Sequence, residues 1–182
     1  TYTLNILDNN GCPSSRSYTI VNPPALVINS TSFVAPLCFN GTDGSAEVSS
    51  VSGGVQTSGY NYNWLVNPAP TGQGTSQITG LSAGTYTVQV TDDNLCLTSA
   101  TITVTQPSAI QINQAIQHVA CHGDSTAQIT VTPSGGTGAY TYNWNGAATP
   151  NGEGTATVNG LPAGSHSVVV TDANLCATNF DF

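Results

Sequence analysis

Residues 80–96 read GLSAGTYTVQVTDDNLC, and residues 160–176 read GLPAGSHSVVVTDANLC. The chain opens on the second half of the same pattern, TYTLNILDNNGC, at residues 1–12. Self-similarity at a fixed period is typical of tandem repeats. Equivalent residues lie 80 to 84 positions apart, so the sequence predicts two repeats that follow the end of an earlier one.

The stretch reads as a turn, a strand and a second turn. Leu81 precedes a tight Ala-Gly turn, and from Tyr86 the sequence alternates with period two, as in a strand with one buried face. Asp92 and Asn94 then supply turn residues. A Tyr just after such a corner resembles the tyrosine corner of immunoglobulin-like sandwiches. His166 replaces Tyr86 in the later copy, so we expect that corner to be held differently.

The rest of each repeat follows one plan. A first strand leads to a Cys-containing turn, a second strand, a Gly-Gly loop and a Tyr-x-Tyr-x-Trp strand. No segment has a helical period, and frequent turn signals between six or seven short strands predict an all-β fold of tandem immunoglobulin-like β-sandwich repeats. The expected core anchors are Trp64, Trp144, Tyr86, Leu81 and Leu161.

Proline residues mark the expected boundaries, because proline cannot continue a strand ladder. They divide the chain into a C-terminal remnant of a preceding repeat at 1–22, a repeat at 23–106, and a repeat at 107–182 that is truncated in its last strand. Within the remnant we expect the return strand at residues 17–21. Connections this short predict stacked neighbours rather than loosely tethered ones.

Composition excludes several function classes. Charged residues make up 5% of the chain, with Arg16 the single cation and a net charge of −8, so a nucleic-acid partner is not expected. No apolar run approaches the ~18 residues of a membrane helix, and we expect no direct membrane insertion. A surface rich in Thr, Ser, Asn and Gly is that of an exported β-protein.

Taken together, these motifs resemble the SprB repeat of surface adhesins from gliding bacteria of the Bacteroidetes group. The shared pattern includes a Cys-containing turn, Gly-Gly, Tyr-x-Tyr-x-Trp, Leu-x-Ala-Gly-x-Tyr-x-Val-x-Val-x-Asp and a final Cys. The resemblance covers essentially the whole chain, with His166 as a departure. It implies a large non-catalytic protein, secreted by the type IX system to the bacterial cell surface, where it serves in adhesion, filaments or gliding motility.

An exported context favours disulfides for the five cysteines. The simplest pairing lies within repeats, Cys38 with Cys96 and Cys121 with Cys176, which leaves Cys12 to a partner outside the chain. Stacking offers another: the first turn of one repeat meets the last hairpin of the next, which pairs Cys38 with Cys176. A third alternative joins Cys96 to Cys121 across the linker.

Clustered turn residues give weak calcium candidates, because Ca²⁺ prefers oxygen ligands. The competing interpretation is that these side chains bond their own backbone and shape the turn. No other cofactor is expected. The candidates are Asp92, Asp93, Asn94, Asp172 and Asn174.

Two further surface features remain. Ser125, in Asp-Ser-Thr, is a candidate for O-glycosylation. The paired Tyr residues at 60, 62, 140 and 142 offer either a sugar platform or core packing, and packing is favoured at this spacing. No nucleophile elbow, paired carboxylates or phosphate loop is present, so no enzyme is expected.

The sequence therefore predicts an extracellular stalk or filament segment of a cell-surface adhesin whose partners are neighbouring repeats. The alternatives are an array of repeats that binds surface polysaccharide, and a fibre in which like filaments associate.

Overall fold

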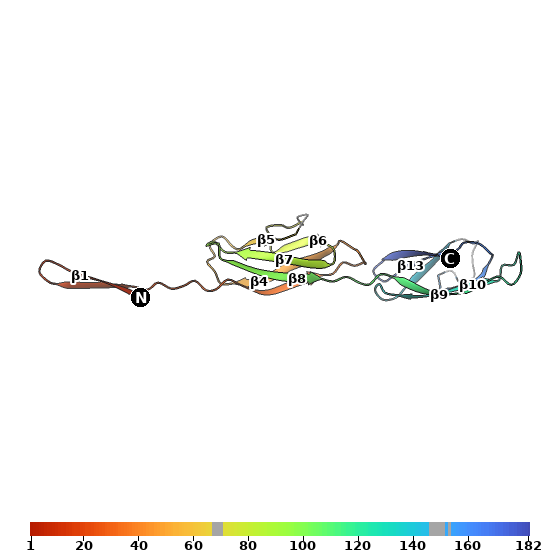
Figure 1. The fold of residues 1–182 in the computed structure, drawn as a ribbon, viewed down its shortest axis with the longest axis horizontal. Helices are drawn as coiled ribbons and strands as arrows, with labels where there is room; N and C mark the ends of the chain where they lie inside the picture. The colour runs from red at the N-terminus through yellow and green to blue at the C-terminus, as the bar shows by residue number, and fades with distance from the viewer. Residues whose placement is uncertain (67–70, 146–151, 153) are drawn as a thin grey trace.

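A computed structural model describes residues 1–66, 71–145, 152 and 154–182. The described residues form strands, turns and loops without a helix, which confirms the all-β class. Among them, accordingly, no helix is long and apolar enough to cross a membrane. The chain lies as a hairpin followed by two sandwiches in a row (Figure 1).

The hairpin pairs β1 (Tyr2–Leu7) with β2 (Pro13–Tyr18). The return strand thus begins earlier than expected, because the turn aligns Leu7 directly with Pro13. The apolar side chains Tyr2, Leu4 and Ile6 are exposed, although the equivalent residues of β7 are buried.

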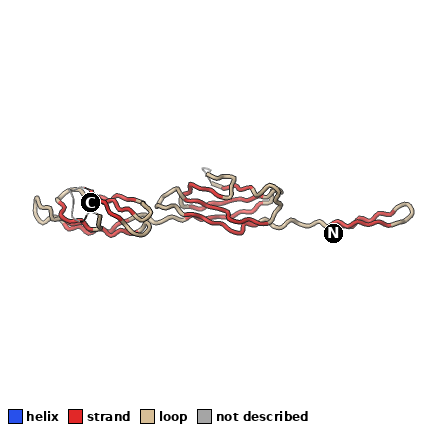
Figure 2. Tube along the Cα trace, turned by 180° about the vertical axis from the view of Figure 1, so that it is seen from behind, coloured by secondary structure: helices blue, strands red, loops and turns tan. Residues whose placement is uncertain are grey.

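Each sandwich consists of two antiparallel three-stranded sheets. Figure 2 shows strands and loops throughout both sandwiches. In the first sandwich, one sheet has the order β3-β4-β6 and the other β5-β7-β8. The first sheet comprises β3 (Val27–Val34), β4 (Gly44–Ser52) and β6 (Gln77–Leu81); the second comprises β5 (Asn61–Trp64), β7 (Gly84–Thr91) and β8 (Leu97–Val104).

The second sandwich repeats this order, with sheets β9-β10-β12 and β11-β13-β14. The first sheet comprises β9 (Gln111–Gln117), β10 (Ala127–Ser134) and β12 (Thr157–Leu161); the second comprises β11 (Thr141–Asn145), β13 (Ser167–Thr171) and β14 (Ala177–Asp181). Because both sandwiches have the same sheet order, the chain is a tandem array of immunoglobulin-like sandwiches.

One tryptophan lies at the centre of each core. Trp64 is 1% exposed and Trp144 is 6% exposed, and each indole N–H donates to a backbone carbonyl, that of Thr75 or Thr155. A buried Trp needs such an acceptor, because an unpaired buried donor is costly. Leu81, Leu161 and Tyr86 are also buried in the two cores.

The corner that precedes β7 is closed by a hydrogen bond. The hydroxyl of Tyr86 donates to the carbonyl of Ser82 at 2.8 Å, four residues earlier. In the second sandwich His166 takes this place, and its Nε2 lies 2.9 Å from the carbonyl oxygen of Pro162. The imidazole therefore replaces the phenol at the same backbone position.

Candidate functional site at the junction of the two sandwiches

The last hairpin of each sandwich is built around one aspartate. Oδ1 of Asp92 accepts the backbone N–H groups of Asn94 at 3.0 Å and Cys96 at 2.8 Å. Asp172 accepts those of Asn174 and Cys176, each at 2.9 Å. Such bonds fix the turn through local side-chain acceptors.

The second oxygen of each aspartate ties the hairpin to the Gly-Gly loop. Oδ2 of Asp92 accepts the N–H of Val55, and Oδ2 of Asp172 accepts that of Thr137, both at 2.8 Å. The Val55 bond is the largest of the causes that hold the pKa of Asp92 below its usual value. For Asp172, burial raises the pKa, but the bonds from Cys176 and the other donors outweigh it and the pKa is lowered.

The remaining calcium candidates are also engaged by the protein. Asp93 accepts hydrogen bonds from the hydroxyls and backbone N–H groups of Ser58 and Thr57, which hold its pKa well below the usual range. The side-chain amide of Asn174 donates to the carbonyl of Leu37. Within the described part of the chain, no three His, Cys, Asp or Glu residues are grouped so as to hold a metal ion. The structure thus uses these side chains to shape turns and anchor loops.

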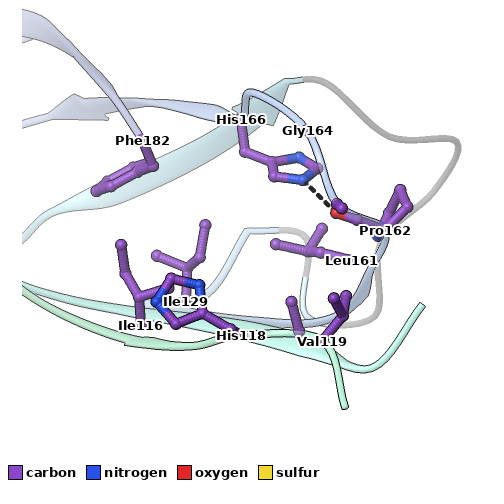
Figure 3. Close-up of a pocket in the computed structure, with 11 residues that line it drawn as sticks. Ile116, His118, Val119, Ile129, Leu161, Pro162, Gly164, His166 and Phe182 are labelled. Carbon is purple, nitrogen blue, oxygen red and sulfur yellow. Dashed lines mark hydrogen bonds between the residues drawn. The ribbon is translucent and has the colours of Figure 1, made fainter. Parts of the chain in front are cut away.

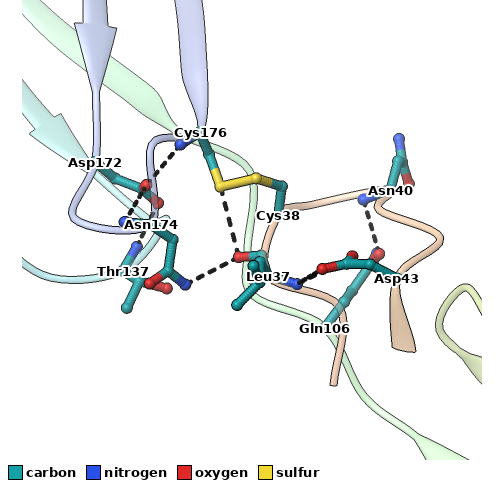
Figure 4. Close-up of a disulfide and its surroundings, with 9 residues drawn as sticks. All are labelled: Leu37, Cys38, Asn40, Asp43, Gln106, Thr137, Asp172, Asn174 and Cys176. Atoms are coloured by element: carbon teal, nitrogen blue, oxygen red, sulfur yellow. Dashed lines mark hydrogen bonds between the residues drawn. A yellow bond between two sulfur atoms is a disulfide. The ribbon is translucent and has the colours of Figure 1, made fainter. Parts of the chain in front are cut away.

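A disulfide joins the two sandwiches (Figure 4). It links Cys38, in the turn after β3, to Cys176, in the turn before β14, with a Cα–Cα distance of 5.6 Å. That distance is within the range a disulfide spans. The pairing suggested by stacking is therefore the one present, and both the pairing within repeats and the pairing across the linker are wrong.

The reason is that the two cysteines of one repeat lie at opposite ends of it. The Cys96 hairpin is tied through Asp92 to the Gly-Gly loop, and Gly54 in that loop donates to Pro24, where the chain enters the sandwich. Cys38 instead lies beside Gln106, where the chain leaves, because Asn40 N–H donates to the Gln106 side chain at 2.8 Å. The eight residues of β3 separate the two ends by roughly 26 Å.

Hydrogen bonds surround the disulfide. Asn174 Nδ2 donates to the Leu37 carbonyl at 3.1 Å, and Gly136 N–H donates to the linker carbonyl of Ser108 at 2.9 Å. The backbone approaches closely there: a Cβ on Gly135 would lie 2.1 Å from the carbonyl oxygen of Ala109. The linker is consequently docked onto the repeat that it enters, and the disulfide attaches that repeat to the one before.

The junction also collects apolar side chains. Phe39, Ile110 and Leu175 line a cavity of about 280 Å³ beside the disulfide. Leu175 has φ of +66° and is 83% exposed, and Leu95 has the same conformation in the first sandwich. Gly11 occupies the equivalent place in the hairpin of β1 and β2, where positive φ is more easily adopted.

Three cysteines are unpaired and exposed: Cys12, Cys96 and Cys121. By repeat position, Cys121 is equivalent to Cys38, and the other two are equivalent to Cys176. Desolvation and the neighbouring Asp92 carboxylate raise the pKa of the Cys96 thiol. A partner for Cys12 beyond the chain remains a prediction.

The tyrosines of the Tyr-x-Tyr-x-Trp strands pack against the cores. Tyr60 and Tyr140 donate their hydroxyls to the carbonyls of Gly53 and Gly135, at the Gly-Gly loops. Tyr62 and Tyr142 lie against the buried clusters, where desolvation is the first cause of their raised pKa. This arrangement differs from an exposed sugar platform. Ser125 is exposed, as a modified residue must be.

A second cavity, of about 200 Å³, lies at the far end of the second sandwich (Figure 3). His118, His166 and Phe182 line it, and the buried Nδ1 of His166 has no hydrogen-bond partner among the described residues. In the first sandwich, the equivalent place beside Gly84 is filled by the buried side chain of Val104. The cavity thus corresponds to a core position rather than to a ligand site.

Comparison with known families identifies the repeat. The sequence profile of the SprB repeat matches residues 30–68 and 113–149, one stretch in each sandwich. The two sandwiches are SprB repeats. SprB repeats are extracellular, adhesin-like and generally non-enzymatic, and the disulfide is consistent with an extracellular or cell-surface setting. No curated protein sequence is detectably similar to the chain.

Solved structures with similar architecture share little sequence with these SprB repeats. Three N-terminal domains of the Hoc capsid protein of bacteriophage RB49 match 87% of the chain at 14% identity, with a TM-score of 0.46. The intimin fragment solved with its receptor's intimin-binding domain matches 86% at 11% identity and a TM-score of 0.40. A structure of the Down Syndrome Cell Adhesion Molecule matches 87% of the chain at 12% identity, with a TM-score of 0.40. The chain spans 57%, 63% and 24% of these structures' lengths.

Proposed function

We propose that this chain is a stalk segment of a large secreted cell-surface adhesin, in which SprB repeats hold a binding domain away from the cell. The observation that carries the proposal is the Cys38–Cys176 bridge, which joins successive sandwiches covalently end to end. The docked linker supports it, since Gly136 bonds to Ser108 and so fixes the direction in which the linker enters the second sandwich. The direct partners are neighbouring repeats. Export by the type IX system and a role in gliding belong to the same proposal.

The test separates a stalk from a carbohydrate-binding array. The purified chain is added in excess to cells that carry the adhesin, and their attachment to a polysaccharide-coated surface is measured. A stalk leaves attachment unchanged, whereas repeats that bind the polysaccharide inhibit it. Antibodies against the chain should label intact cells, and failure to label them would overturn the surface location.

A further inference from the structure

The position of the disulfide determines which residues carry tension along the chain. Cys38 follows β3, the first strand of its repeat, and Cys176 precedes β14, the last strand of the next. The shortest covalent path from the entry of the first sandwich to the end of the chain therefore uses only residues 23–38 and 176–182. Residues 39–175 lie in a loop that the disulfide closes.

This short path runs in one direction through both sandwiches. β3 starts beside the Gly-Gly loop at the entry end and leads to Cys38 at the junction. β14 starts at the junction and leads to Phe182 at the far end, where Phe182 and His166 exchange two backbone hydrogen bonds. A pull on the two ends of the molecule thus runs along β3, across the two sulfur atoms and along β14 (Figures 1 and 4).

The path has almost no slack. Fully extended, it measures roughly 80 Å, at about 3.5 Å per residue. Much of it is already β-strand, which rises about 3.3 Å per residue. Without the bridge, residues 23–182 would extend to roughly 560 Å once both sandwiches had unfolded.

We infer that the Cys38–Cys176 disulfide makes this pair of repeats inextensible: tension reaches the bridge before it can unfold residues 39–175. This inference rests on the proposed stalk function, and it deepens that function by assigning tension to the first strand of one repeat and the last strand of the next. The strands within residues 39–175 then pack against these two strands and set the length of each repeat, and they need not resist force themselves.

Repeat equivalence extends the inference to adjacent junctions. Cys121 occupies the position of Cys38, and Cys96 that of Cys176, and both are exposed. The same bridge to further SprB repeats would produce two interleaved covalent paths, each of which passes through alternate first and last strands. Each sandwich would then contain one strand of each path.

Single-molecule force spectroscopy on the whole chain tests the inference. Handles are attached enzymatically at the two termini, so that no cysteine is consumed. The bridged chain should show no unfolding step beyond the opening of the β1–β2 hairpin, which releases less than about 80 Å. Cys38→Ser, or reduction of the unaltered chain, should add two steps of roughly 200–250 Å each, one for each sandwich.

The matched control is Cys121→Ser, which removes an exposed, unpaired cysteine at the equivalent position and should behave like the bridged chain. Steps of 200–250 Å in the bridged chain, or identical traces with and without the bridge, would overturn the inference. Peptide mapping without reduction must also recover Cys38 linked to Cys176. A bridged chain that unfolds under force leaves the stalk proposal standing, whereas inhibition of attachment by the purified chain removes the stalk and leaves the force traces unaffected.

Discussion

At the scale of single residues, the same turn is made three times. Asp8, Asp92 and Asp172 each accept the backbone N–H groups two and four residues later. Asp92 and Asp172, both buried, also bind the Gly-Gly loop of their own sandwich. One carboxylate therefore sets the turn with one oxygen and joins two segments with the other.

This arrangement predicts that acid destabilises the sandwiches. The pKa of Asp92 and of Asp172 is lower in the folded chain than the ordinary value of about 3.9. Their contribution to stability is present in full above that value and is lost as the pH falls from there through the lower folded pKa. Melting temperatures between pH 7 and pH 2 should fall steeply below about pH 4.

The Asp92→Asn/Asp172→Asn variant should melt lower at neutral pH and lose the part of this acid dependence that Asp92 and Asp172 supply, while Asp93 keeps its own. Asp8→Asn is the matched control, because Asp8 makes the turn bonds and, in the described residues, ties no second segment to the hairpin. An unchanged acid slope in the double variant would contradict the assignment.

At the scale of elements, the Gly-Gly loop is where each repeat holds its own linker. Gly54 donates to Pro24, and Gly53, with φ of +78°, would place a Cβ 1.8 Å from the carbonyl oxygen of Ala25. The loop also receives the Tyr60 hydroxyl at the Gly53 carbonyl. The linker, the last hairpin and the segment that leads into β5 thus meet at the Gly-Gly loop. This contact fixes the direction in which the linker enters the sandwich.

Gly53→Ala should therefore cost more than an ordinary loop substitution. The positive φ alone costs about 1 kcal/mol, and the clash with Ala25 should bring the loss of unfolding free energy to at least about 2 kcal/mol. Gly59→Ala is the control, since Gly59 has φ of +105° and open space around its Cβ position. Urea unfolding measures the free energy of unfolding of both variants. Equal losses in the two would show that the contact with Ala25 does not contribute to the cost.

Much of this architecture is predictable from local pattern. Period-two alternation and turn residues locate the strands, because one face of each is buried. The link between the Gly-Gly loop and the linker was not predicted, although Gly-Gly and the Pro-containing linker recur in both repeats. The return strand at Pro13 was misplaced, because apolar content alone does not show where pairing begins after a tight turn.

The cysteine pairing shows a second limit of local pattern. Spacing alone favours a bond between Cys38 and Cys96. The topology shows that they lie far apart, because β3 leads to Cys38 at one end of the sandwich and β7 leads to Cys96 at the other. His166 shows a similar limit, because the sequence did not indicate what would hold the corner in place of a tyrosine. The imidazole Nε2 lies close to the Pro162 carbonyl, which is equivalent to the Ser82 carbonyl that accepts the Tyr86 hydroxyl.

At the scale of the whole molecule, the two repeats are joined by three kinds of connection. The linker passes covalently from β8 to β9, the disulfide joins Cys38 to Cys176, and the Asn174 side chain donates to the Leu37 carbonyl beside it. The Gly136–Ser108 bond lies within the second repeat and does not join the two. Bending therefore requires loss of the disulfide and of the Asn174–Leu37 hydrogen bond, while the linker stays intact.

Breaking the bridge should accordingly free the two sandwiches to reorient. Residual dipolar couplings give an alignment tensor for each sandwich, and in the oxidised chain the two tensors should agree in size and direction, as for one rigid body. In Cys38→Ser/Cys176→Ser they should become unequal, because the Asn174–Leu37 hydrogen bond is too weak, at about 1 kcal/mol, to hold the junction alone. Cys96→Ser/Cys121→Ser removes two exposed, unpaired cysteines and should leave the tensors matched. Matched tensors in both variants would mean that the docked linker alone makes the rod stiff, and the disulfide would then act only against tension.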